Sequence, residues 1–134
     1  YQGQVLETIL QDVLDTPVSP ELLPQEDDKI VQKTEDIVGP YELHDFFIYH
    51  MVRFGDEPCK LYKKTKLAFK DKYDKETIKK WLRLFYWRFF SQQFKRSCIP
   101  DGPKVGSVAL SPRGDWRMPS DANVQIWLDE VEKI

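Results

Sequence analysis

The sequence has 134 residues, 41% of them apolar and 13% aromatic, which is enough for one small domain with a packed core. No apolar run approaches the roughly 18–20 residues that span a bilayer, so we expect no membrane segment. Two distant cysteines, Cys59 and Cys98, argue against a disulfide framework or a zinc site and favour a cytoplasmic location. His44 and His50 are not at a ligand spacing, so we interpret both as structural and expect no metal site.

The net charge of −2 conceals a strong separation of charge along the chain. Residues 1–57 contain 3 Lys/Arg and 13 Asp/Glu, residues 58–96 contain 13 and 3, and residues 97–134 contain 4 and 6. The basic segment 58–96 has two interpretations. Its cations are either solvated or paired with the acidic part of the chain, or they form a surface for phosphates or nucleic acid.

The first third of the chain is predicted to contain one short helix and a long irregular segment. Residues 4–14 are amphipathic, because apolar side chains recur at helical spacing. Pro17 ends this helix, since proline disfavours helical backbone in the preceding residue. Residues 15–39 are mostly loop. Within them, Ser19-Pro20-Glu21 has the composition of a short helix start, with a cap, a proline and an acid in order.

Two further helices are predicted at residues 40–55 and 58–70. Both have an apolar stripe at three- and four-residue steps. Gly55 is placed to end the first helix, and Pro58 to open the second.

The longest predicted helix covers residues 75–95, with Asp74 as its N-cap. Its core face carries Ile78, Trp81, Leu82, Phe85, Phe89 and Phe90. Residues 96–119 return to proline- and glycine-rich loop, and within them only 104–110 suggest a strand, a short one. A last helix is predicted to start at Ser120.

No catalytic residues can be assigned from motifs. The chain has no P-loop or Rossmann glycine pattern and no readable Ser-His-Asp or Cys-His set. The notable chemistry is a group of cations beside rigid loops: Lys95, Arg96, Arg113 and Arg117. Such cations either bind a phosphate or pyrophosphate, or they hold the loop together, with Arg113 and Arg117 paired to Asp115 and Asp121.

Five segments of the chain are distinctive in sequence and in order. They are residues 16–22, 34–43, 90–96, 102–106 and 111–121. The last contains Ser-Pro-Arg-Gly-Asp-Trp-Arg, which is far more specific than a short motif. Together these segments resemble the C-terminal run of the glutamine-dependent NAD⁺ synthetases, and the resemblance covers essentially the whole chain.

The resemblance implies a fold class and an activity for the parent protein. We expect a mainly α unit over residues 1–134, the helical C-terminal portion of a synthase domain with an α/β nucleotide α-hydrolase-like fold. The family's enzymes are ligases that adenylate deamido-NAD⁺ with Mg²⁺ and ATP. Ammonia derived from glutamine then displaces AMP to give NAD⁺.

This sequence departs from the family pattern by truncation. The Ser-Gly-Gly-x-Asp-Ser loop that holds the ATP pyrophosphate is absent, and so is the glutaminase domain with its Glu-Lys-Cys set. We therefore expect this chain alone to be inactive and to bind no cofactor.

The resemblance also assigns roles to individual residues. Lys95 matches the lysine of a basic motif that contacts deamido-NAD⁺, and Arg96, Asp115 and Arg117 lie in matching segments, where a structural role stays open. Ser19 and Glu21 match a different segment of the family, the one that approaches the ATP phosphates.

Two other classes of function compete with that of an enzyme part. The basic segment 58–96 would serve a nucleic-acid-binding module, although its aromatic residues lie at core spacing with the lysines opposite, so we do not expect nucleic acid as a partner. An oligomerisation element is the other alternative, because the apolar helix 75–95 needs a large partner surface. We expect a homo-oligomer.

Overall fold

The computed structural model describes residues 2–16 and 34–134, and its contacts divide the chain into two units, 1–39 and 40–134. Within the described residues the secondary structure consists of seven α-helices without a strand. The prediction of a mainly helical unit is confirmed. The short strand predicted at 104–110 is wrong, because these residues form irregular chain.

The first unit contains α1 (Gln2–Asp15) and α2 (Thr34–Val38). Helix α1 confirms the amphipathic pattern at 4–14 and extends it slightly at both ends. Its apolar side chains are 54–77% exposed: Val5, Leu6, Ile9, Leu10, Val13 and Leu14. The predicted helix start at Ser19-Pro20-Glu21 lies outside the described residues.

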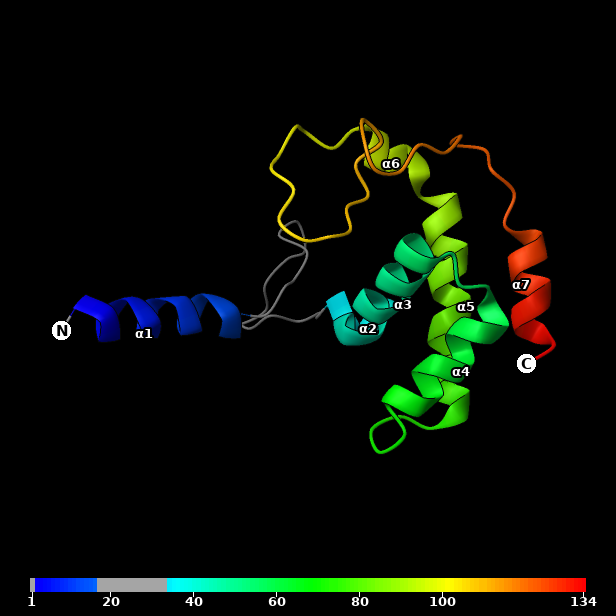
Figure 1. The fold of residues 1–134 in the computed structure, drawn as a ribbon, viewed down its shortest axis with the longest axis horizontal. Helices are drawn as coiled ribbons and strands as arrows, with labels where there is room; N and C mark the ends of the chain where they lie inside the picture. Colours follow the sequence, from blue (N-terminus) through cyan, green and yellow to red (C-terminus); the bar gives the residue numbers. More distant parts are fainter. Residues whose placement is uncertain (1, 17–33) are drawn as a thin grey trace, which may run out of the picture. The chain divides into compact units, whose positions relative to one another are not determined.

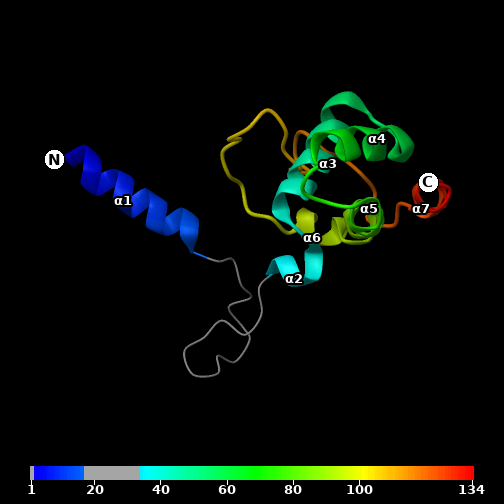
Figure 2. The ribbon, with the colours of Figure 1, turned by 90° about the horizontal axis from the view of Figure 1, so that it is seen from below.

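The second unit is built around one long helix, α5 (Lys75–Ser91). Helices α3 (Tyr41–Phe54), α4 (Pro58–Ala68) and α7 (Gln125–Glu132) all pack against α5, and α4 also contacts α3 and α7 (Figures 1 and 2). The short helix α6 (Gln93–Ser97) continues from the end of α5. The loop that follows it leads back toward α7.

The predicted helix ends at the centre of this unit are confirmed. Gly55 ends α3 with a φ of 65°, in the left-handed region that glycine adopts without steric cost, and its N–H donates to the Met51 carbonyl at 3.0 Å. Pro58 opens α4. Asp74 caps α5 by accepting a 2.8 Å hydrogen bond from the Thr77 N–H.

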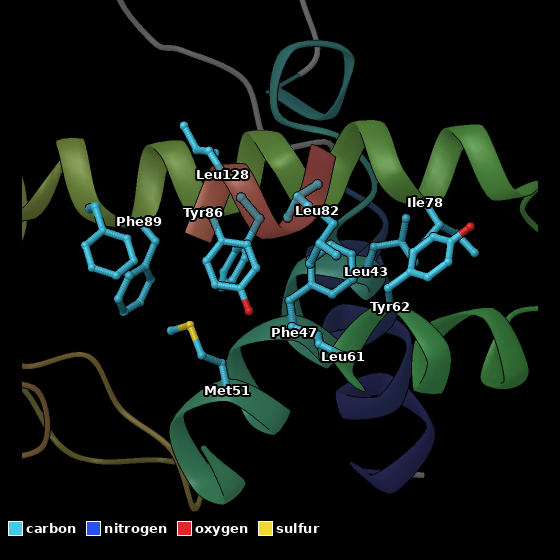
Figure 3. Close-up of a cluster of buried hydrophobic side chains, with 13 residues drawn as sticks. Leu43, Phe47, Met51, Leu61, Tyr62, Ile78, Leu82, Tyr86, Phe89 and Leu128 are labelled. Carbon is cyan, nitrogen blue, oxygen red and sulfur yellow. The ribbon is translucent and has the colours of Figure 1, made fainter. Parts of the chain in front are cut away.

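The core lies between α5 and the three helices that surround it (Figure 3). Helix α5 supplies six buried side chains: Ile78, Leu82, Phe85, Tyr86, Phe89 and Phe90. The predicted core face is confirmed except at two positions. Trp81 is only half-buried, whereas Tyr86 is fully buried and stacks on Trp127 of α7, with ring centroids 5.5 Å apart.

Two predicted helix boundaries are wrong. The helix expected at 75–95 is interrupted at Gln92, where the Phe89 carbonyl accepts a hydrogen bond from the Arg96 side chain. The helix expected from Ser120 starts only at Gln125. There the Asn123 side chain accepts a 2.7 Å bond from the Gln125 N–H, a local bond that favours a helix start at this point.

Candidate anion-binding site

The candidate site combines α6 with the loop at residues 111–117, and Phe89 of α5 supports both. The Phe89 ring lies beneath the Arg96 guanidinium, 4.5 Å from its central carbon. The same ring packs edge-on against Trp116, at 5.2 Å between centroids. One buried aromatic side chain therefore holds the basic turn and the loop together.

The Arg96 side chain is half-buried and is bonded to residues of α5 and α6. Its Nε donates to the Gln93 Oε1 atom at 2.8 Å, and its Nη2 donates to the Phe89 carbonyl. Burial lowers the pKa of the Arg96 guanidinium. These contacts favour the structural role that the sequence left open, and binding of a substrate by Arg96 stays a prediction.

Lys95, its neighbour, has the opposite environment. The side chain is exposed, and its Nζ lies 6.0 Å from the centre of the Phe94 ring. Within 2–16 and 34–134 no carboxylate pairs with it. An ammonium group held on a short helix without a counter-charge is available to a ligand anion.

The 111–117 loop is closed by its own backbone. The Ser111 carbonyl accepts hydrogen bonds from the N–H groups of Gly114, at 3.3 Å, and Trp116, at 3.1 Å. This tight turn presents Arg113, Asp115 and Arg117 to solvent, while Trp116 points inward.

The ion pairs of this loop differ from those expected. Arg113 pairs with Asp101, at 2.5 Å between Nε and Oδ1, and Asp115 pairs with Lys104, at 2.7 Å. Arg117 donates through Nη2 to the Arg113 carbonyl at 3.2 Å, and the described chain shows no carboxylate beside it. The alternative in which Arg113 and Arg117 pair with Asp115 and Asp121 is wrong, because Asp101 pairs with Arg113, Lys104 pairs with Asp115, and Arg117 donates to the Arg113 carbonyl.

Comparison with known proteins gives the chain its relatives. It is 42% identical to a glutamine-dependent NAD(+) synthetase of Mycobacterium leprae, over 99% of this chain and 22% of that protein. It is 40% identical to the proteins of the same name in Mycobacterium bovis and Mycobacterium tuberculosis, over 98% of this chain and 22% of each.

The homologues of this chain are glutamine-dependent NAD(+) synthetases. The chain spans about a fifth of the length of these relatives. No protein-family profile matches the sequence. The resemblance on which the sequence analysis relied is therefore confirmed, while the roles of single residues stay predictions.

Lys104, Asp101 and Arg113 were not among the residues matched to roles in the synthetase family, although Arg113 belongs to the loop cations for which phosphate binding was one of two interpretations. All three shape the loop through ion pairs. Lys104 lies within one of the segments that resemble the family, which was a usable signal. The sequence holds no such signal for Asp101, because its pairing depends on a turn of the chain that residue propensities do not predict.

Two predicted ATP-phosphate residues, Ser19 and Glu21, lie outside the described residues. In the part that is described, no group of three His, Cys, Asp or Glu side chains is arranged to hold a metal ion. No described helix is long and apolar enough to cross a membrane.

Three lysines of the basic segment 58–96 are paired with acidic residues of the first half of the chain. The buried Asp56 carboxylate contacts Lys60 Nζ at 2.8 Å and Lys64 Nζ at 2.5 Å. Glu42 pairs with Lys72 at 2.5 Å. The interpretation of an internally neutralised basic face is confirmed for these lysines.

Asp56 also explains His50, whose Nδ1 lies 3.2 Å from the Asp56 carboxylate. The His50 ring packs on Phe46, with centroids 4.3 Å apart. Burial alone would raise the pKa of Asp56, but hydrogen bonds from Lys60 and Lys64 outweigh it, and the pKa lies below its usual value. His50 is therefore part of a structural cluster, as expected.

Proposed function

We propose that this chain is the C-terminal, substrate-binding part of a synthetase that converts deamido-NAD⁺ to NAD⁺ with ATP and glutamine-derived ammonia. The homology to named NAD(+) synthetases supports the reaction. The exposed ammonium of Lys95, which has no carboxylate partner among the described residues, supports the binding role beside the anchored Arg96. The parent protein would be a cytoplasmic ligase, and the 134-residue chain would not complete the reaction by itself.

In the proposed reaction, the carboxylate of deamido-NAD⁺ attacks the α-phosphorus of ATP and pyrophosphate leaves. Ammonia then attacks the resulting acyl adenylate, and AMP leaves as the amide forms. Lys95 would bind an anionic group of the dinucleotide, its pyrophosphate or its carboxylate, because a compact ammonium forms charge-assisted hydrogen bonds to such oxygens. Arg117 would add a second cation, and Asp115 would shape the loop through Lys104.

ATP and Mg²⁺ belong to this proposal as the co-substrate of the parent enzyme. Ser19 and Glu21 would lie near the ATP phosphates. The described chain would then be the helical portion of an α/β nucleotide α-hydrolase-like synthase domain.

The decisive test is Lys95→Ala in the full-length synthetase. We expect kcat/KM for deamido-NAD⁺ to fall about 30-fold or more, mainly through KM, because one partner of a charge-assisted contact is lost. KM for ATP and glutamine should stay unchanged. Lys63→Ala, an exposed lysine of α4 without an ion pair among the described residues, is the matched control. An unchanged kcat/KM for Lys95→Ala would remove this residue from the site.

We also propose that the protein is a homo-oligomer. The six apolar side chains of α1 that are more than half exposed favour a partner surface for this helix. Light scattering should therefore give a mass above that of one chain for the full-length protein, and a monomer at micromolar concentration would contradict the proposal.

A further inference from the structure

Arg113 joins the 111–117 loop to the segment that leaves α6, and its side chain is about half exposed. Its Nη2 donates to the carbonyl of Ile99, in the segment that leaves α6. Its Nε contacts Asp101 Oδ1 at 2.5 Å. Its own carbonyl accepts the hydrogen bond from Arg117 Nη2 at 3.2 Å.

These contacts have the geometry that only arginine can supply. The planar guanidinium directs two N–H groups to two different acceptors, a backbone carbonyl and a carboxylate. A lysine at this position could reach one acceptor but could not fix the direction of both. The side chain of Asp101 is 90% exposed, so the ion pair itself adds little to the free energy of folding.

The main effect of the Arg113 contacts is therefore on the position of the 111–117 loop. The Ser111 carbonyl closes the turn through its hydrogen bonds inside the loop, and Trp116 packs against Phe89 of α5. Neither contact fixes the outer edge of the loop against the chain that leaves α6.

Two ion pairs do so, Lys104 with Asp115 and Arg113 with Asp101. Of the two cations, only Arg113 also donates to a backbone carbonyl of that chain, and the guanidinium of Arg117 is hydrogen-bonded to Arg113 itself.

We propose that Arg113 is a positioning residue, which holds the 111–117 loop to the end of α6 and thereby places the Arg117 guanidinium for the anionic part of the dinucleotide. This inference rests on the proposed function for the identity of the ligand. The anchoring of the loop by Arg113 does not depend on it. Arg113 acts through Arg117 and does not itself contact the ligand.

The test in the full-length synthetase uses Arg113→Lys, Arg117→Ala and the double variant. We expect Arg113→Lys to raise KM for deamido-NAD⁺ about tenfold and to change kcat less than about threefold, since misplacement of a binding group weakens binding before chemistry. The double variant should lose no more than Arg117→Ala alone. Additive losses, or a wild-type KM for Arg113→Lys, would overturn the inference.

Arg83→Lys is the matched control, because Arg83 is exposed to a similar degree as Arg113 and forms an ion pair with Glu132, at 2.6 Å, between α5 and α7. It should leave KM unchanged.

A second measurement separates this inference from the proposed function. In the 134-residue chain, backbone ¹⁵N relaxation at residues 99–101 and 113–117 should show greater nanosecond motion in Arg113→Lys than in wild type or Arg83→Lys. If the full-length protein makes no NAD⁺, the proposed function fails while this measurement still decides the anchoring role. If the relaxation of Arg113→Lys matches wild type, the anchoring role fails whatever the activity.

Discussion

The guanidinium of Arg96 lies 4.5 Å from the centre of the Phe89 ring and donates to the carbonyl of the same residue. One side chain thus closes the junction of α5 and α6 by a cation–π contact and a hydrogen bond. Lys95, the preceding residue, extends into solvent. The two adjacent cations therefore have different environments: Arg96 is bonded to α5 and α6, whereas Lys95 is exposed to solvent.

Arg96→Lys should destabilise the fold. Lysine keeps the charge but cannot reach Gln93, Phe89 and the aromatic face together, so we expect the free energy of unfolding to fall by about 1–2 kcal/mol. Urea unfolding followed by circular dichroism measures this change. Lys95→Gln is the control and should change stability by less than about 0.5 kcal/mol. Equal effects of the two variants would contradict the division of roles.

Asp56→Ala should destabilise the packing of α3 against α4. The carboxylate is buried and is contacted by Lys60, Lys64 and His50. Its removal leaves these groups without their anion, but both lysines are partly exposed and can turn to water. We expect a loss of about 2–3 kcal/mol, below the range for a fully buried pair. Lys60→Gln, with a side chain 64% exposed, should cost less than about 1 kcal/mol by the same unfolding measurement.

The same carboxylate predicts how stability depends on pH. The folded-state pKa of Asp56 is lowered, so its contribution is complete above the unfolded pKa of about 4 and is lost as pH falls through the folded pKa. Unfolding titrations from pH 7 to pH 3 should therefore show a shallower acid loss for Asp56→Asn than for wild type. Part of the remaining pH dependence comes from Glu42. Hydrogen bonds from Lys72 and Tyr73 lower the pKa of this carboxyl group. Parallel curves for the two proteins would contradict this role of Asp56.

The helices could be predicted from the sequence because each one has local signals. The stripe at 40–55, the glycine at 55, the proline at 58 and the cap at 74 all act within a few residues of one another. The errors at Gln92 and Ser120 arose where a side chain competes with the helix for a backbone group. Such bonds depend on the final geometry, which periodicity does not contain.

The candidate site shows the same limit more strongly. Its sequence segments named the family, and the comparisons confirmed that resemblance. The partners of its cations could not be predicted, because Arg113 meets Asp101 and Ile99 only after the chain has turned back on itself. Charge counting also treated all basic residues of 58–96 alike, whereas the structure pairs Lys60, Lys64 and Lys72 with acids.

That pairing leads to a last prediction, on nucleic acid. Binding of a single strand needs several free cations, since affinity comes from the release of counterions by neutralised phosphates. Four of the thirteen basic residues of segment 58–96 are paired with carboxylates, namely Lys60, Lys64, Lys72 and Arg83. Eight of its ten aromatic side chains are buried or half-buried, so they cannot stack on the bases of a single strand. We expect no binding of a 20-nucleotide single strand by fluorescence anisotropy at about 150 mM salt and weak binding, if any, at about 50 mM.

Variants that release the cations give the matched comparison for this titration. Glu42→Gln and Glu132→Gln each remove one negative charge and free Lys72 and Arg83. Their binding at low salt should exceed that of wild type and should disappear as salt rises, because the added affinity is electrostatic. Micromolar binding by the wild-type chain at about 150 mM salt would show that the pairing does not neutralise this face. In that case the basic segment, and not the α6 loop alone, would have to be treated as an anion-binding surface.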